Sequence, residues 1–330
     1  MSRIGVIGAG AWGTALAQVY AVAGNDVMIA AREQDIVDQI NTKHANTAYL
    51  PDVQLAETLR ATTNASEAAA CDVVIIVTPA QHVRATLKSV APQITDKKPL
   101  VICAKGIELN SGKMMSTVAE EETPDAEIAI LTGPNFAGEI ARGLPSAATV
   151  AAHTQSAADA ICALLNSRNL RPYASDDIIG AEIGGAVKNV IAIASGMVHG
   201  MGLGESARAA LVTRGLAEIA RLAERMGGKR ETLMGMCGMG DMMLTCSSMQ
   251  SRNFSLGALM GQGQSLESIL AARNGVTEGV HTARAVMVMA KDHNVDMPIS
   301  NMVDQCLNNG LSLKDGVRQI MERPLKAEKH

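Results

Sequence analysis

Aromatic side chains are scarce in this sequence: they make up 2% of its 330 residues, whereas methionine occurs 19 times. A core with so little Phe and Tyr must be packed largely by aliphatic and methionine side chains. Methionine suits this role because its flexible side chain fills irregular gaps. We therefore interpret the methionines as core packing and not as a cofactor motif.

An excess of either charge is also missing. The net charge is −4, and charged residues make up 19% of the chain against 47% hydrophobic residues. This composition is typical of a globular protein and does not indicate a nucleic-acid or acidic-surface partner. No apolar run reaches the length that we expect of a membrane span, and the N-terminus lacks the basic region and cleavage site of a signal peptide. We expect a cytoplasmic protein.

The cysteines and histidines are not spaced for metal binding. No Cys-x-x-Cys pair occurs, and the seven histidines show no ligand spacing. Most of the cysteines lie in apolar runs, which favours buried free thiols in a reducing compartment over disulfides. We expect no metal site. The six cysteines are Cys71, Cys103, Cys162, Cys237, Cys246 and Cys306.

The strongest motif lies at the N-terminus. The apolar run Ile4–Ile7 leads directly into Gly8-x-Gly10-x-x-Gly13, and a helix-compatible run follows. A dinucleotide site needs this context: Gly8 allows a tight turn, Gly10 lets a pyrophosphate approach the backbone, and Gly13 lets helix and strand pack closely. The alternative is a glycine-rich turn without a ligand. The full strand–turn–helix context favours a nicotinamide cofactor site.

Apolar strands and helical segments alternate after this motif. Repeated β–α units with continuous apolar strands indicate a mostly parallel, doubly wound sheet. Polar residues at the carboxyl ends of such strands gather at one edge of the sheet, where ligands bind. The further expected strands are Val27–Ala31, Leu59–Thr63, Cys71–Val77, Leu100–Ala104, Ile128–Leu131, Ala147–Ala151 and Leu170–Tyr173.

Strand signals disappear beyond about Asp176. The segment Ile178–Val198 is apolar nearly all round, so we expect it to be buried through the middle of a helical domain. We predict an α/β protein with a dinucleotide-binding Rossmann-like domain over 1–177 and an all-helical substrate-binding domain over 178–330. Its further expected helices are Arg208–Met226, Ser265–Asn274, Thr282–His293 and Ser300–Leu307.

The residue after the second strand bears on the choice of cofactor. An acidic residue there would bond the ribose 2′-hydroxyl of NADH, whereas an arginine accommodates the 2′-phosphate of NADPH. Arg32 occupies this position and Glu33 follows it. We expect NADP(H) or NAD(H), with a modest preference for NADPH. Alternatively, Arg32 is an exposed loop charge.

Lys188 lies in an apolar helical segment, where a lysine is costly unless its ammonium has a partner. Gly184, one turn earlier, is expected to leave open space on the same face. A lysine facing the cofactor cleft could donate a proton to a carbonyl during hydride transfer. A lysine that reaches the helix surface is equally consistent with the pattern. Asp241, after two glycines, is either its partner or a helix N-cap.

Other polar residues have both a functional and a structural interpretation. Ser251-Arg252-Asn253 suits a phosphate at a helix start, or a capped helix with a surface arginine. Lys105 follows a strand, and it lies either at the cofactor-binding edge of the sheet or in a loop as an exposed lysine. Gly133-Pro134-Asn135 could let a ligand approach the backbone, or forms a turn. Glu278 lies in an expected flexible loop, where it contacts cofactor or only solvent.

Together these stretches resemble the bacterial NAD(P)-dependent glycerol-3-phosphate dehydrogenase family. They occur in the family's order and cover nearly the whole chain, which makes the combination far more specific than any single motif. Trp12 stands where the family often has Tyr or Phe, and Asn135 where it often has Ser or Thr. The similar stretches are Gly8–Ala17, Ala104–Gly106, Gly133–Ala137, Gly184–Val190, Gly238–Asp241, Gln250–Asn253 and Val276–Gly279.

The resemblance implies roles for individual residues. Lys188 would be the proton donor or acceptor, Lys105 would bind substrate and cofactor, and Asp241 would keep Lys188 charged. The glycerol phosphate site would include Lys188, Lys105 and Asp241 together with Gly133, Asn135, Ser251, Arg252 and Asn253. The dinucleotide would contact Ala11, Trp12, Arg32, Ala137, Arg252, Val276 and Glu278 in addition to the glycines.

The reaction that the resemblance implies is the reversible reduction of dihydroxyacetone phosphate to sn-glycerol 3-phosphate, which feeds glycerophospholipid synthesis. A 3-hydroxyacid dehydrogenase of the same two-domain architecture is the main alternative, because it too places Lys-Asn in the first helix beyond the Rossmann domain. The cluster at Ser251–Asn253 suits a phosphate ester better. A non-catalytic dinucleotide sensor is the alternative from another class. We also expect a homodimer.

Overall fold

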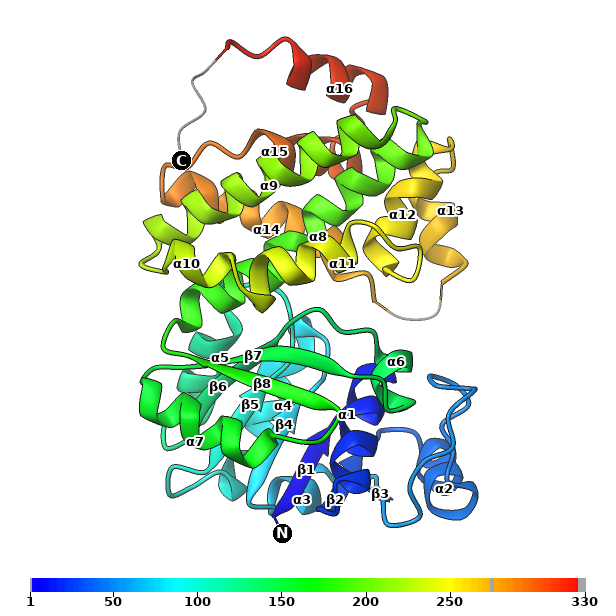
Figure 1. The fold of residues 1–330 in the computed structure, drawn as a ribbon, viewed down its shortest axis with the longest axis vertical. Coiled ribbons are helices and arrows are strands. Elements are labelled where there is room, and N and C mark those ends of the chain that lie inside the picture. Colours follow the sequence, from blue (N-terminus) through cyan, green and yellow to red (C-terminus); the bar gives the residue numbers. More distant parts are fainter. Residues whose placement is uncertain (1, 274–275, 326–330) are drawn as a thin grey trace.

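The computed structural model describes residues 2–273 and 276–325. These residues form a domain built on one sheet and a second domain made of helices (Figure 1). The sheet consists of β1 Arg3–Ile7, β2 Asp26–Ala30, β3 Arg60–Thr62, β4 Val73–Ile76, β5 Pro99–Ile102, β6 Glu127–Thr132, β7 Ser146–Ala152 and β8 Leu170–Ser175.

The strand order is β3-β2-β1-β4-β5-β6-β7-β8. Neighbouring strands are parallel except β6 and β7, which pair antiparallel. This confirms the predicted mostly parallel, doubly wound sheet. The chain moves outward from β1 to β3 and then crosses back to β4, so the order reverses between β1 and β4. A crevice opens at the carboxyl ends of the strands at such a reversal, and ligands bind there.

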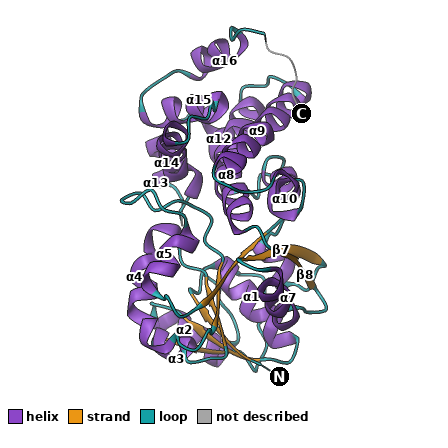
Figure 2. Ribbon diagram, turned by 90° about the vertical axis from the view of Figure 1, so that its left-hand side faces the viewer, coloured by secondary structure: helices purple, strands orange, loops and turns teal. Residues whose placement is uncertain are grey.

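Helices cover both faces of the sheet. Figure 2 shows α4 and α5 on one side of the strands and α1 and α7 on the other. Each side has its own apolar cluster, with Leu16 and Tyr20 of α1 in one and Leu87 of α4 with Val118 of α5 in the other. The elements are α1 Ala11–Val22, α2 Gln34–Lys43, α3 Ala65–Ala69, η1 Ala80–His82, α4 Val83–Val90, η2 Ala91–Gln93, α5 Met115–Glu122, α6 Ala137–Ala141 and α7 Gln155–Leu165.

The helical domain is arranged around one buried helix, as the apolar run predicts. Nearly every residue of α8 is buried, and α12 packs on it backbone to backbone. A Cβ added at Gly257 of α12 would lie 2.0 Å from the carbonyl oxygen of Ile193. The elements are α8 Ile178–Gly200, α9 Glu205–Arg225, α10 Arg230–Leu233, η3 Met236–Gly240, α11 Asp241–Thr245, α12 Arg252–Gly261, α13 Leu266–Ala271, α14 Glu278–Asp292, α15 Pro298–Asn308 and α16 Leu313–Met321.

The expectation that no apolar segment reaches the length of a membrane span is wrong for α8. The helix Ile178–Gly200 is long and apolar enough to cross a membrane by length and composition alone. In the fold, 94% of its most apolar 18-residue stretch is buried inside the protein. Its hydrophobicity is explained by its position at the centre of the helical domain.

Several helix boundaries differ from the predicted ones. The helix predicted over Thr282–His293 begins earlier, at Glu278, because Thr277 is its N-cap. The helix predicted over Ser265–Asn274 ends at Ala271, and Asn274 lies outside the described residues. The glycines at 275 and 279 made the start of α14 resemble a loop in the sequence.

Candidate active site

The backbone at the three glycines of the N-terminal motif has a different geometry at each position, and each geometry fits the role that the sequence predicts. Gly8 has a φ of +116°, a conformation that L side chains rarely adopt. A Cβ at Gly13 would lie 1.9 Å from the carbonyl oxygen of Gly8, whereas one at Gly10 would meet nothing within 4 Å. The backbone is therefore open at Gly10, where a pyrophosphate has to approach.

The N-terminus of α1 also fits a dinucleotide phosphate. Its N-cap is Gly10, no side chain caps it, and its first turn holds no acidic residue. The positive end of the helix dipole thus faces the crevice without a competing carboxylate from that turn. Ala11 and Trp12, both partly exposed, begin this helix.

Asn46 braces this turn from the segment between α2 and β3. Its Nδ2 donates to the carbonyl oxygen of Ala9 at 2.9 Å and to Oγ1 of Thr14 at 2.8 Å, and all three groups are buried. Sequence reasoning missed Asn46, because no spacing rule links a loop asparagine to a distant glycine motif.

Arg32 follows β2, as predicted, and its side chain is 88% exposed. Its guanidinium lies 3.4 Å from Glu33, an ion pair that open solvent leaves weak. Both charges are therefore free to reorient toward the ribose of a bound dinucleotide.

Two lysines and one aspartate converge where the two domains meet. Lys105 follows β5, Lys188 lies on α8, and Asp241 is the first residue of α11. Lys188 Nζ donates to Asp241 Oδ1 at 2.5 Å, and Lys105 Nζ donates to Asp241 Oδ2 at 2.7 Å. Lys105 Nζ also lies 3.3 Å from the carbonyl oxygen of Gly133. A single buried carboxylate thus holds a cation from each domain.

This arrangement decides between the alternatives for Lys188 and Asp241. Lys188 is buried and does not reach the helix surface, and Asp241 is its partner and not the N-cap, which is Gly240. Gly184 does not leave open space: a Cβ there would lie 2.8 Å from the carbonyl oxygen of Cys237. The glycine lets η3 approach α8, and η3 delivers Asp241 to Lys188.

Thr245 completes the centre and was missed from sequence. Its Oγ1 accepts from Lys188 Nζ at 2.7 Å and donates to Asp241 Oδ1 at 3.1 Å. It follows Asp241 by one turn of α11, so the i, i+4 spacing was the available signal.

Burial and the neighbouring opposite charge have opposing effects on the pKa of both Lys188 and Asp241. Burial lowers the pKa of Lys188 from 10.5 to about 8, with Lys105 adding to this effect and Asp241 opposing it. Burial alone would raise the pKa of Asp241, but the two ammonium groups outweigh it and hold the pKa below its ordinary value. Lys188 is therefore an acid that can exchange a proton near neutral pH.

The cluster Ser251–Asn253 begins α12. Ser251 is the N-cap, and its Oγ accepts from the amide of Phe254 at 3.2 Å. Arg252 is exposed, whereas Asn253 is buried and donates to Asn189 Oδ1 at 2.9 Å. Asn253 therefore also joins α12 to α8, beside Lys188.

The residues that follow β6 lie at the same edge of the sheet. Gly133 is packed against β7, because a Cβ there would lie 2.8 Å from Ala148 Cα. The Asn135 side chain bonds Ser146 and, at 3.2 Å, the carbonyl oxygen of Ala147. Ala137 begins α6. Asn135 thus fixes this turn on β7.

Glu278 is not in a flexible loop: it begins α14, and its Oε1 accepts from the amide of Ala80 at 3.2 Å. Burial raises its pKa. This bond joins the helical domain to the turn after β4, beside the crevice. Val276, partly exposed, lies just after the two residues outside the described structure.

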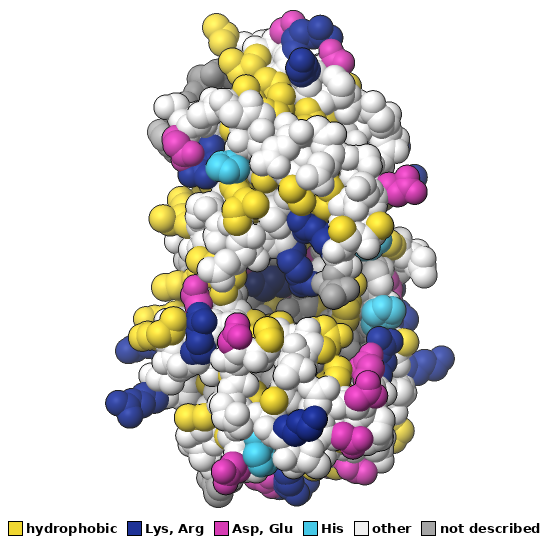
Figure 3. All heavy atoms as spheres, turned by 90° about the vertical axis from the view of Figure 1, so that its right-hand side faces the viewer, with side chains coloured by type: hydrophobic (Ala, Val, Ile, Leu, Met, Phe, Trp, Pro, Cys, Tyr) yellow, Lys and Arg dark blue, Asp and Glu magenta, His cyan; other side chains and the backbone are white. Residues whose placement is uncertain are grey.

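The surface between the two domains is hollowed, and Figure 3 shows Lys and Arg side chains gathered there. A cationic hollow of this kind suits a phosphorylated substrate and a dinucleotide.

Known proteins match this chain over nearly its full length. Residues 3–158 match the model of the NAD-dependent glycerol-3-phosphate dehydrogenase N-terminus, and residues 177–318 match that of its C-terminus. The chain is 48% identical to glycerol-3-phosphate dehydrogenase (NAD(P)+) of Parvibaculum lavamentivorans, over 99% of this chain and 98% of that protein. It is 50% identical to the Maricaulis maris enzyme of the same name, over 98% of each.

Solved structures agree with these matches. The crystal structure of glycerol-3-phosphate dehydrogenase from Coxiella burnetii superposes with a TM-score of 0.92 at 34% identity, covering 98% of this chain and 99% of that one. D-mandelate dehydrogenase with NADH reaches only 0.59 at 15% identity, over 93% of this chain and 98% of that one, which is a likeness of fold alone.

Proposed function

Because this chain belongs to the NAD-dependent glycerol-3-phosphate dehydrogenase family, we propose that it reversibly reduces dihydroxyacetone phosphate to sn-glycerol 3-phosphate at the Lys105–Asp241–Lys188 centre. It is an NAD(P)-dependent oxidoreductase. The observation that supports these residues most strongly is the pairing of one cation from each domain with a single buried carboxylate. The product is the backbone from which glycerophospholipids are built.

Each residue of the centre has a distinct role in this proposal. A bound reduced nicotinamide supplies the hydride for the carbonyl carbon. The Lys188 ammonium gives its proton to the carbonyl oxygen in reduction, and the neutral amine takes it back from the hydroxyl in oxidation. Lys105, with its side chain 25% exposed, stabilises the negative charge that develops on that oxygen. Asp241 keeps both amines in place.

The phosphate group is held at the start of α12. Arg252 provides an exposed charge, and the first turn of the helix adds its dipole. The Ser251 hydroxyl and the Asn253 amide complete the set, with Gly133 and Asn135 on the sheet side. The dinucleotide would be held by Gly8–Gly13 together with Ala137, Val276 and Glu278. These contacts follow the family's pattern.

Thermal unfolding distinguishes a phosphate-ester substrate from a hydroxy acid. A ligand that binds only the folded state raises the unfolding temperature. We expect sn-glycerol 3-phosphate to protect the protein in the presence of cofactor, and 3-hydroxybutyrate at the same concentration to give no protection. Protection by the hydroxy acid alone would favour a 3-hydroxyacid dehydrogenase.

We further propose that NADPH is modestly preferred over NADH, because Arg32 can pair with the 2′-phosphate. Arg32→Ala is expected to raise KM for NADPH about tenfold, equivalent to roughly 1.4 kcal/mol, and to leave KM for NADH unchanged. Arg60→Ala, at an exposed arginine on neighbouring β3, is the control. Equal changes for both cofactors would contradict the role of Arg32.

We also propose that the protein acts in the cytoplasm as a homodimer formed through its helical domain. The net charge and the buried α8 are consistent with a soluble enzyme. Light scattering after size-exclusion chromatography tests the dimer, and a mass of one chain would contradict it.

A further inference from the structure

The segment that follows Lys105 is attached to both domains. Ile107 and Met114 form an isolated antiparallel bridge, and both belong to the apolar cluster of the helical domain. The segment then enters α5 of the sheet domain. The chain between Lys105 and α5 therefore joins the position of a catalytic lysine to packing in the other domain.

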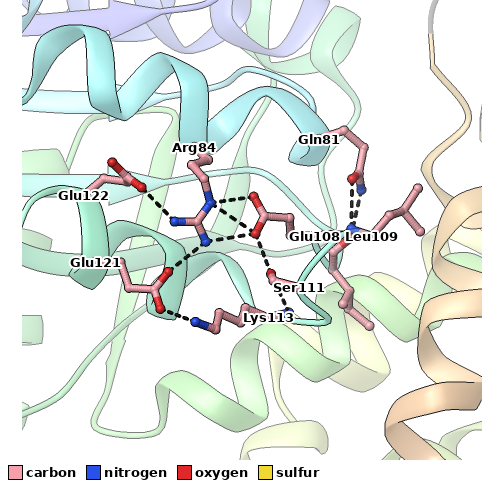
Figure 4. Close-up of polar contacts among 9 residues, drawn as sticks. Gln81, Arg84, Glu108, Leu109, Ser111, Lys113, Glu121 and Glu122 are labelled. Atoms are coloured by element: carbon pink, nitrogen blue, oxygen red, sulfur yellow. Dashed lines mark hydrogen bonds and ion pairs between the residues drawn. The ribbon is translucent and has the colours of Figure 1, made fainter.

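On the sheet side, this segment is fixed by a polar cluster around one arginine (Figure 4). Arg84 of α4 makes a two-pronged ion pair with Glu108, with Nε–Oε1 and Nη2–Oε2 distances of 2.9 Å. Its other contacts are Glu121 at 2.8 Å and Glu122 at 2.7 Å, both on α5. Gln81 bonds backbone groups on either side of Glu108. The sheet domain thus contacts the middle of the segment through Glu108 and its neighbours.

On the helical side, the polar contact comes from Glu182 of α8. Its Oε1 accepts from the backbone amide of Ser116 at 2.8 Å, and its Oε2 accepts from the Ser116 hydroxyl at 2.5 Å. The carboxylate is buried, and it accepts hydrogen bonds from the first turn of α5 although it belongs to the other domain. Burial raises its pKa to about 7, and the bonds from Ser116 oppose that rise.

Part of this segment borders a hollow and lacks packing partners on that side. The stretch Leu109–Met114 borders a hollow of about 470 Å³ whose other wall includes Val288, Met289 and His293. Groups that line a hollow lose packing contacts on that side, so polar contacts contribute more to holding such a segment in place. Glu182 supplies such contacts at the segment's end.

We propose that Glu182 is a positioning residue for the reaction. It lies on the same rigid helix as Lys188 and holds the end of the segment that begins at Lys105. It thereby fixes how the two lysines meet at Asp241. This inference rests on the proposed function of that centre and adds a residue that does not touch the substrate.

A second buried glutamate provides a matched control. Glu218 of α9 accepts from the amides of Ile299 at 2.7 Å and Ser300 at 3.1 Å, and from the Ser300 hydroxyl at 3.1 Å. Burial raises its pKa to about 7 as well. All of these partners belong to α15 of the helical domain. Glu218 therefore shares the chemistry of Glu182 without a link to Lys105.

The test compares Glu182→Ala with Glu218→Ala in the full chain. Both are expected to lower the unfolding midpoint, because each leaves buried donors without an acceptor. Glu182→Ala alone is expected to lower kcat for dihydroxyacetone phosphate about tenfold with KM for the cofactor unchanged. Glu182→Gln is expected to restore most of kcat, since its amide oxygen can still accept from Ser116. Equal kcat in the two alanine variants would overturn the proposal.

Hydrogen exchange gives a readout that does not depend on turnover. The amides of 104–108 are expected to exchange faster in Glu182→Ala than in wild type or Glu218→Ala. Unchanged exchange there would contradict the positioning role. Inactivity of the wild type on dihydroxyacetone phosphate would instead contradict the proposed function. If Glu182→Ala does not fold, Ser116→Ala removes one of the two bonds and is expected to show a smaller change of the same kind.

Discussion

Lys188→Ala is expected to lower kcat for reduction of dihydroxyacetone phosphate by about 10³-fold and to leave cofactor binding intact. Loss of a positioned general acid typically costs two to four orders of magnitude, that is, about 10²–10⁴-fold. The proposed cofactor site lies at the glycine motif, so binding of NADPH, measured by fluorescence titration, is not expected to weaken.

The control for this variant is a lysine that is partly buried and lies outside the proposed site. Lys98 directly precedes β5, at the end of that strand opposite to Lys105, and its Nζ donates to the carbonyl oxygen of Ala69 at 2.9 Å. Lys98→Ala is expected to keep kcat within about twofold of wild type, because surface or structural lysines do not enter the chemical step. Near-normal turnover in Lys188→Ala would rule out its role as the proton donor.

The pH dependence of turnover follows from the pKa of Lys188, which lies near 8. Reduction needs the ammonium form, so its kcat is expected to be constant below about pH 8 and to fall tenfold per pH unit above it. Oxidation of sn-glycerol 3-phosphate needs the neutral amine, so its kcat rises up to about pH 8 and then levels off. If kcat for reduction and kcat for oxidation changed in the same direction with pH, this assignment would be contradicted.

Asp241→Asn is expected to have the second largest effect, because Asp241 is, among the residues that the structure describes, the one carboxylate paired with both Lys105 and Lys188. Removing one member of a buried ion pair costs about 3–5 kcal/mol of unfolding free energy. Urea unfolding measures this loss. The loss would be smaller if Lys188 gives up its proton in the variant.

The same variant is expected to move the pH profile. The Asp241 carboxylate favours the charged form of Lys188, so its removal lowers the pKa of Lys188 below 8. The fall in kcat for reduction therefore begins at a lower pH than in wild type. Thr245→Val, which removes a neutral contact to Lys188, is the control and is expected to shift the profile less. An unchanged profile in Asp241→Asn would contradict the coupling.

Sequence patterns predicted most of the sheet because its strands are buried on both faces. Continuous apolar runs, such as Cys71–Val77 for β4, are long enough to be distinguished from loops. The glycine motif was equally informative. The positive φ at Gly8 and the lack of space for a side chain at Gly13 both favour glycine over every other residue type. The burial of α8 followed from its apolar character all round.

The centre itself could be predicted only through the resemblance. Lys105, Lys188 and Asp241 come from three elements, and no spacing rule states which side chains meet across a domain boundary. Asp241 was equally consistent with an N-cap, because both roles put an acid at a helix start. Gly184 was misinterpreted for a similar reason: a glycine that makes room for a partner helix and one that leaves open space look identical in sequence.

The most direct test of the central claim is the initial rate of reduced nicotinamide oxidation with dihydroxyacetone phosphate, followed by absorbance with NADPH and with NADH. We expect rapid oxidation, faster with NADPH, and none when a 3-oxo acid replaces the phosphate ester. No oxidation with either cofactor, in protein shown to be folded, would contradict the assignment of the Lys105–Asp241–Lys188 centre to this reaction.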